Sequence, residues 1–252
     1  MKTALKIAAF ALVTAGPAAA GDPVTYTAGD MVLEGYEARA EAPKGTVVIL
    51  PTWNGVSDFE KDRARMLAAM GYDALAADLH GKGALPATME AKEAALKAFF
   101  ADEARMHAIL GAALDRAASY GSDKIVVMGY SMGGGAAIDI GRSGLGAAHG
   151  VDAYAIFSGR VSDPGGRMIP EGMAPVFVAH GDQDPRVPAS SLINFEDDLD
   201  MAGVAHTITV YPGAGHLFSA PGFPSYDAAL DRDSWDKLGT FLTETLSGEG
   251  AM

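Results

Sequence analysis

The 252-residue sequence contains no cysteine, and this absence excludes several kinds of chemistry at once. Without thiols the protein cannot form disulfides, thiolate zinc sites, iron–sulfur clusters or a cysteine nucleophile. Cations are also scarce, because 19 lysines and arginines stand against 32 aspartates and glutamates, which gives a formal net charge of −13. Nucleic acids and anionic membranes bind clustered cations, so we expect neither to be the main partner.

The N-terminal apolar run is too short to cross a membrane, which takes about 20 residues. This run, Ile7–Val13, follows two lysines, and the small residues Ala18–Ala20 come directly before Gly21. A cationic start, a short apolar centre and a small-residue cleavage point are typical of a secretory signal peptide. We therefore expect cleavage after residues 1–20 and a periplasmic or secreted bacterial protein without membrane insertion. The alternative is an amphipathic N-terminal helix.

Residues 21–252 contain no repeat, low-complexity tract or linker, so we expect one domain. Residues 24–40 predict a β-hairpin that turns at Ala28-Gly29-Asp30. Beyond residue 45, short apolar segments alternate with amphipathic ones, which predicts an α/β fold with a mostly parallel sheet of about seven to eight strands and helices on both faces. The strands expected after the hairpin are 46–50, 73–79, 124–128, 152–157, 175–180 and 206–211. The expected helices begin at Ser57 and span 86–120, 132–142, 189–202 and a last segment from Trp235 to Leu246.

A catalytic motif lies between the expected strand 124–128 and the expected helix 132–142. The residues are Gly129-Tyr130-Ser131-Met132-Gly133. A G-x-S-x-G sequence in a strand–turn–helix setting is typical of a nucleophile elbow, in which a strained turn exposes the serine hydroxyl and the next N–H contributes to the oxyanion hole. The alternatives are a Gly/Ser-rich turn without chemistry and a phosphate loop, but the phosphate-loop glycine spacing and its Gly-Lys-Ser/Thr ending are both missing.

Candidate acids follow the expected strand 175–180, in the position that α/β-hydrolases require between serine and histidine. Asp182 and Asp184 both occur there. We favour Asp184, because Pro185 biases it toward an extended conformation that faces away from the strand. Asp182 is expected to cap the turn, and the alternative is that both aspartates are turn residues.

The candidate base is His216, which follows the last expected strand and precedes the last expected helix. Ser131, Asp184 and His216 then occur in the chain order of an α/β-hydrolase triad. His80 and His180 also end expected strands, so they are competing candidates.

Beyond these three candidate residues, the chain resembles the dienelactone hydrolase family of α/β-hydrolases over nearly all of residues 24–246. The matching stretches are 47–55, 71–79, the elbow, Gly181-x-x-Asp184-x-x-Val187-Pro188 and 213–218. The resemblance implies Asp184 and His216 as the partners of Ser131, and the backbone N–H groups of Trp53 and Met132 as the oxyanion hole.

The chain departs from the founding members of that family at several positions. Ser131 stands where they carry cysteine, and Thr52 stands where they carry a glutamate near the nucleophile. Lys82 falls near one of their two substrate-carboxylate arginines, and Ala220 replaces the other. We therefore expect a serine-nucleophile variant. The side chains expected to line its substrate pocket are Thr52, Lys82, Leu217 and Phe218.

These observations predict a carboxylic ester hydrolase that cleaves small soluble esters or lactones through an acyl-enzyme intermediate. No large inserted lid is evident, which favours small substrates over long-chain lipids. No metal or organic cofactor is expected, because the sequence has no H-E-x-x-H or similar ligand spacing. The alternatives are an amidase or peptidase on the same fold, and a non-catalytic binding protein that kept the fold.

Overall fold

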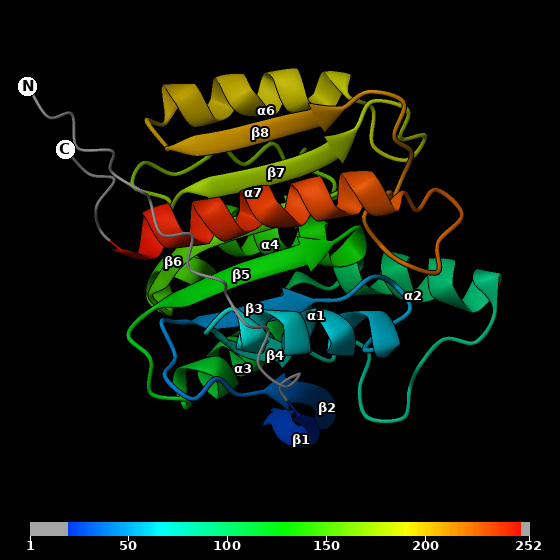
Figure 1. The fold of residues 1–252 in the computed structure, drawn as a ribbon. Coiled ribbons are helices and arrows are strands. Elements are labelled where there is room, and N and C mark those ends of the chain that lie inside the picture. The colour runs from blue at the N-terminus through cyan, green and yellow to red at the C-terminus, as the bar shows by residue number, and fades with distance from the viewer. Residues whose placement is uncertain (1–19, 248–252) are drawn as a thin grey trace, which may run out of the picture.

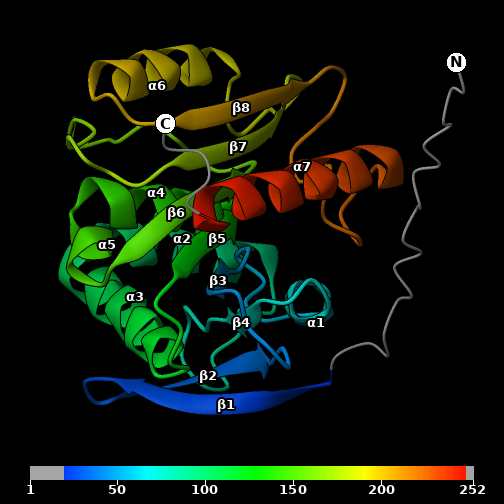
Figure 2. The same cartoon turned by 60° about the vertical axis from the view of Figure 1, so that its left-hand side comes forward.

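The computed structural model describes residues 20–247, so the expected signal peptide lies outside the described residues except for Ala20. At the start of the described chain, β1 (Gly21–Ala28) and β2 (Met31–Ala38) form an antiparallel hairpin. The hairpin turns at Gly29, whose φ of 57° lies in the left-handed region that glycine adopts without steric cost. The predicted hairpin is therefore present at one edge of the sheet (Figure 2).

Eight strands form one sheet in the order β1-β2-β4-β3-β5-β6-β7-β8. The β2–β4 pair is antiparallel, and every pair from β4 through β8 is parallel. Strands β3, β4, β5 and β7 are buried at every residue, which explains why their sequences are continuously apolar rather than alternating. The strands after the hairpin are β3 (Thr46–Leu50), β4 (Asp73–Ala76), β5 (Ile125–Tyr130), β6 (Val151–Phe157), β7 (Val176–Gly181) and β8 (His206–Tyr211).

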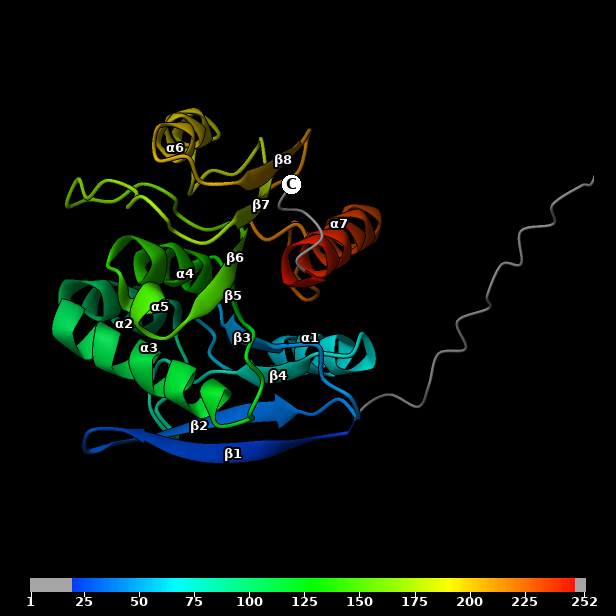
Figure 3. The same cartoon turned by 90° about the vertical axis from the view of Figure 1, so that its left-hand side faces the viewer.

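Helices cover both faces of this sheet, as Figures 1 and 3 show. Apolar residues of α1 and α7 pack into the core on one face, and those of α3, α4 and α6 pack into the core on the other. The predicted α/β-hydrolase architecture is confirmed. The helices are α1 (Asp58–Ala69), α2 (Met89–Ala101), α3 (Glu103–Ala118), α4 (Met132–Arg142), α5 (Leu145–Ala148), α6 (Ser190–Met201) and α7 (Ala228–Ser247).

Two expected elements differ in the structure. The single helix predicted over 86–120 is two helices, because Asp102 leaves the helical conformation (φ −114°, ψ 85°) and its side chain accepts the N–H of Arg105 at 3.0 Å. Asp102 thus caps α3 in the way that short acidic side chains cap helix N-termini. The strand predicted over 73–79 ends at Ala76, and the carboxylate of Asp78 instead accepts the backbone N–H groups of His80 and Gly81. The short helix α5 had no counterpart among the predicted elements.

Two glycines allow α4 to lie directly against the end of the central strands. A Cβ atom on Gly133 would lie 2.0 Å from the carbonyl oxygen of Leu50, and one on Gly129 would lie 2.1 Å from the carbonyl oxygen of Gly133. The N–H of Gly133 also donates to the carbonyl of Pro51 at 3.0 Å. The start of α4 is therefore fixed against the loop that follows β3.

We predict that Gly133→Ala destabilises the protein, because its Cβ would overlap a backbone oxygen that no side-chain movement can clear. The expected loss in the free energy of unfolding is about 1–3 kcal/mol, the usual cost of overpacking, measured by urea denaturation.

Gly111→Ala is the matched control, since this glycine lies inside α3 and an added Cβ would meet His149 only at 3.7 Å. Here we expect a gain of about 0.5–1 kcal/mol from helix propensity. Equal stability of Gly133→Ala and the wild type would contradict the close approach.

Candidate active site

Ser131 lies at the turn between β5 and α4. Its φ of 52° is one of three positive values among the non-glycine residues that the structure describes. Backbone hydrogen bonds hold this unfavourable conformation. The Ser131 N–H donates to the carbonyl of Phe157 at 2.9 Å, and the Gly135 N–H donates to the carbonyl of Ser131 at 3.0 Å. Such local strain is typical of functional sites and here exposes the hydroxyl at the carboxyl end of the sheet.

Three side chains from separate loops form a continuous hydrogen-bonded chain. The Oγ atom of Ser131 lies 2.8 Å from Nε2 of His216, and Nδ1 of His216 lies 2.7 Å from Oδ2 of Asp184. Each loop follows a parallel strand, so the carboxyl ends of β5, β7 and β8 bring the residues together. The structure thus unites the three residues that chain order had selected.

Asp184 is fixed on both of its carboxylate oxygens. While Oδ2 faces His216, Oδ1 accepts the N–H groups of Arg186 at 2.8 Å and Val187 at 3.0 Å. Burial acts to raise the pKa of Asp184, but the bond and charge of His216 and the two backbone amides outweigh it, so the pKa is lowered. The carboxylate therefore stays ionised at neutral pH. Asp182, by contrast, accepts the N–H of Gly213 at 2.7 Å and braces the turn, away from His216.

The loop that carries His216 is anchored on two sides. The N–H of Leu217, a residue with φ of 61°, donates to Oγ of Ser158 at 3.2 Å. Beyond it, Nη2 of Arg63 in α1 donates to the carbonyl of Ser219 at 2.7 Å and is paired with Asp231 in α7. These contacts define the position of the imidazole relative to Ser131.

The competing histidines have other contacts. His180 is fully buried, and its Nε2 lies 2.9 Å from the carbonyl of Val187. His80 places Nε2 at 3.2 Å from the carbonyl of Trp53. Burial lowers the pKa of both groups, so each is neutral at pH 7 and donates a hydrogen bond from Nε2 to its carbonyl acceptor.

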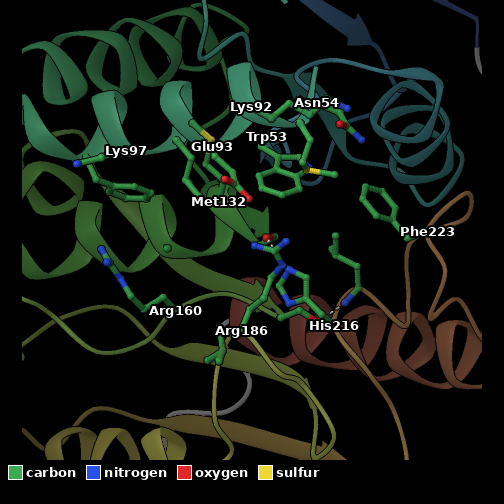
Figure 4. A pocket seen from close by; sticks show the side chains of 18 of the residues that line it. Trp53, Asn54, Lys92, Glu93, Lys97, Met132, Arg160, Arg186, His216 and Phe223 are labelled. Atoms are coloured by element: carbon green, nitrogen blue, oxygen red, sulfur yellow. Dashed lines mark hydrogen bonds between the residues drawn. The ribbon is translucent and has the colours of Figure 1, made fainter. Parts of the chain in front are cut away.

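A cavity of about 800 Å³ opens beside Ser131 and His216. Trp53 and Met132 both line it, and among the hydrogen bonds of residues 20–247 neither of their N–H groups has an acceptor. Figure 4 shows Trp53, Met132 and His216 around this space. Two free amides next to the serine hydroxyl provide the donors that an oxyanion requires.

Three of the four side chains expected in the substrate pocket do not line this cavity. Thr52 is buried and directs its hydroxyl to Glu60, Lys82 forms an ion pair with Glu34, and Phe218 packs in the core against Tyr211. The expectation is therefore corrected for these three, and Leu217 is the one that lines the cavity.

Helix α2 supplies much of the cavity wall, which the sequence did not indicate, and the segment after β6 adds Arg160. Four cations line the wall beside a single acid, Glu93, and none of the four forms an ion pair within the described part of the chain. Arg186 lies 4.6 Å over the ring of Trp53, and Arg160 lies 5.0 Å over that of Phe100. The four cations are Lys92, Lys97, Arg160 and Arg186, all labelled in Figure 4.

Neither a metal-binding cluster nor a spanning helix was found in the described region. Between residues 20 and 247, no group of three or more His, Cys, Asp or Glu side chains is arranged to hold a metal ion. Over the same residues no helix is long and apolar enough to cross a membrane.

Comparison with known proteins relates this site to one family. The model of the dienelactone hydrolase family matches residues 33–246. A protein of Methylorubrum extorquens, named "Putative carboxymethylenebutenolidase", is 28% identical over 226 residues, which are 83% of this chain and 76% of that protein. A solved structure described as a dienelactone hydrolase-like promiscuous phosphotriesterase from metagenomic libraries is 28% identical, has a TM-score of 0.79 and aligns over 90% of this chain and 99% of its own. The chain therefore belongs to the dienelactone hydrolase family and is a hydrolase.

Proposed function

We propose that this protein is a serine hydrolase that cleaves small carboxylic esters or lactones through an acyl-enzyme intermediate. The observation that carries the proposal is the hydrogen-bonded chain Ser131–His216–Asp184 at the mouth of the cavity. A serine is a weak nucleophile unless an adjacent base accepts its proton, and this geometry supplies that base.

In the first step, Oγ of Ser131 attacks the substrate carbonyl while Nε2 of His216 takes the hydroxyl proton. The carbonyl oxygen becomes an oxyanion that accepts bonds from the N–H groups of Trp53 and Met132, each worth about 3–4 kcal/mol in such sites. Asp184 holds the imidazole tautomer and stabilises the imidazolium. The imidazolium then protonates the leaving alkoxide, and the alcohol departs; in a lactone it stays attached to the acyl group.

In the second step, water replaces the alcohol. His216 removes a proton from water, whose oxygen attacks the acyl carbon, and the same two amides hold the second oxyanion. Collapse of this intermediate returns the proton to Ser131 and releases the carboxylic acid. The name of the Methylorubrum relative refers to butenolide hydrolysis, which supports lactones as a substrate class alongside open esters.

The cavity wall favours an anionic substrate. Four cations that form no ion pair within residues 20–247 face one acid in a chain whose formal net charge is −13, so the cavity wall is positive in an otherwise acidic chain. A carboxylate on the substrate would satisfy these charges by charge-assisted hydrogen bonds. We therefore extend the proposal to esters and lactones that carry a carboxylate group.

We predict that a fluorophosphonate probe labels the wild type and that peptide mapping places the adduct on Ser131. Ser131→Ala should lose both labelling and esterase activity, because no other hydroxyl within the described chain is hydrogen-bonded to His216. A wild type that stays unlabelled would contradict the hydrolase mechanism and favour a binding protein.

Two aspartates provide a matched pair of variants for testing the hydrogen bond between Asp184 and His216. Asp184→Asn should lower kcat by roughly 10⁴-fold, as expected when the imidazole is held in the wrong tautomer. Asp182→Asn removes a carboxylate two residues away that only braces a turn, so kcat should remain near the wild-type value.

The preference for anionic substrates predicts a selective effect of Arg160→Met. We expect KM for a carboxylate-bearing ester to rise roughly tenfold, because one charge-assisted bond is lost, whereas KM for its neutral methylated analogue should be unchanged. The control is Arg232→Met, which removes an exposed cation of α7 outside the cavity. Equal changes for both esters would contradict the anion-binding role.

Export remains a further proposal, supported by where the first described strand begins. β1 begins at Gly21, directly after the expected cleavage point, so cleavage would keep every described strand. We predict that the full chain expressed in a bacterium with two membranes is recovered from the periplasm with Gly21 as its N-terminal residue, determined by mass spectrometry. Recovery in the cytoplasm with residues 1–20 intact would contradict export.

A further inference from the structure

The loop between β3 and α1 carries the Trp53 amide, and its neighbouring N–H groups are all occupied. The Thr52 N–H donates to Oε1 of Glu60 at 3.2 Å, and the Asn54 N–H donates to Oγ1 of Thr52 at 3.3 Å. The Gly55 N–H donates to the carbonyl of Thr52 at 3.0 Å. Among residues 52–55, the Trp53 N–H alone has no acceptor in the described chain, and Trp53 lines the cavity.

Glu60 is the source of this arrangement. It lies in the first turn of α1, is fully buried, and uses its two carboxylate oxygens for different partners. Oε2 accepts the N–H and hydroxyl of Ser57, which completes the capping box of the helix. Oε1 accepts the N–H of Thr52 and, at 3.4 Å, its hydroxyl. A capping box requires only the first set of bonds, so the bonds to Thr52 need a separate explanation.

His80 holds the loop on the other side of the Trp53 N–H. Its Nε2 donates to the Trp53 carbonyl at 3.2 Å, and its own N–H is fixed by Oδ1 of Asp78 at 2.8 Å. A neutral imidazole has one N–H, and the carbonyl acceptor places that proton on Nε2. The Pro51–Thr52 and Trp53–Asn54 peptide groups, which flank the peptide that contains the Trp53 N–H, are thus held by the side chains of Glu60 and His80.

We propose that Glu60 and His80 are positioning residues that hold the Thr52–Asn54 loop so that the Trp53 N–H points at the developing oxyanion. This inference rests on the proposed serine hydrolase function. Neither residue touches the substrate: Glu60 acts through Thr52, and His80 acts through the Trp53 carbonyl. Preorganised donors are effective because no reorganisation is needed when charge develops, so a mobile loop would lose transition-state stabilisation while substrate binding stays intact.

The test compares Glu60→Ala with Ser57→Ala. Both variants damage the helix cap, which is typically worth about 1 kcal/mol, but Ser57→Ala retains the bonds from Thr52 to Oε1. We expect Glu60→Ala to lower kcat by roughly 10–100-fold, somewhat less than outright loss of an oxyanion donor, with KM changed less than threefold. Ser57→Ala should keep kcat within about threefold of the wild type at a similar loss of stability.

Two further measurements separate positioning from general damage. The affinity for a boronic acid, whose tetrahedral adduct on Ser131 places an oxygen in the oxyanion hole, should fall in parallel with kcat in Glu60→Ala. Glu60→Gln should recover most of kcat, because its amide oxygen can still accept the Thr52 N–H. If Glu60→Ala does not fold, Thr52→Val serves instead, since it removes the hydroxyl that donates to Oε1 of Glu60 and accepts the Asn54 N–H. We expect kcat and boronic acid affinity to fall together.

The outcomes are distinct. Equal kcat for Glu60→Ala and Ser57→Ala would overturn the positioning role, and so would a fall in kcat without a fall in boronic acid affinity. For Thr52→Val, unchanged kcat would overturn it. Failure of the proposed function itself would appear separately, as a wild type that neither hydrolyses esters nor reacts at Ser131.

Discussion

The active site depends on the close backbone contact between the start of α4 and the end of β3. Only glycine at 133 permits this approach, since any Cβ would overlap the carbonyl oxygen of Leu50. The contact joins the start of α4 to the loop that carries Trp53, and Ser131 with its positive φ lies directly before it. The proposed nucleophile and the two free amides are thus grouped around one backbone contact, and the parallel sheet brings Asp184 and His216 to it from neighbouring strand ends.

Charge is distributed unevenly around this centre. The chain as a whole is strongly acidic, whereas the cavity wall carries four cations that have no acidic partner among the described residues. The two arginines among them, Arg160 and Arg186, lie over aromatic rings. This arrangement holds each guanidinium in place while its N–H groups stay available. An acidic exterior with a cationic cavity would concentrate small anions at the mouth, because like charges elsewhere offer them no competing site.

Sequence reasoning was most effective where local signals determine structure. The apolar run 46–50 became β3 with the same bounds, and Ser57, where a helix was expected to begin, is the N-cap of α1. It failed at Asp102, where a single N-cap divides an otherwise helical stretch. It also failed for Thr52, Lys82 and Phe218, because neither a matching position in the resembled family nor a place beside a site residue in the chain determines which way a side chain points. The cations of α2 and the second set of bonds of Glu60 depend on tertiary contacts, and no local pattern in the sequence reports those.

Helix α1 is bonded to two loops of the active site from a single turn of its length. Glu60 binds the loop of Trp53, and Arg63 binds the loop of His216 through the carbonyl of Ser219. Much of the wall of the cavity comes from α2, which lies on the opposite face of the sheet from α1 (Figure 3). The two loops and this part of the wall are therefore supported from opposite faces of the sheet. A substitution in α2 can change the shape and charge of the cavity while the bonds from α1 to both loops stay in place.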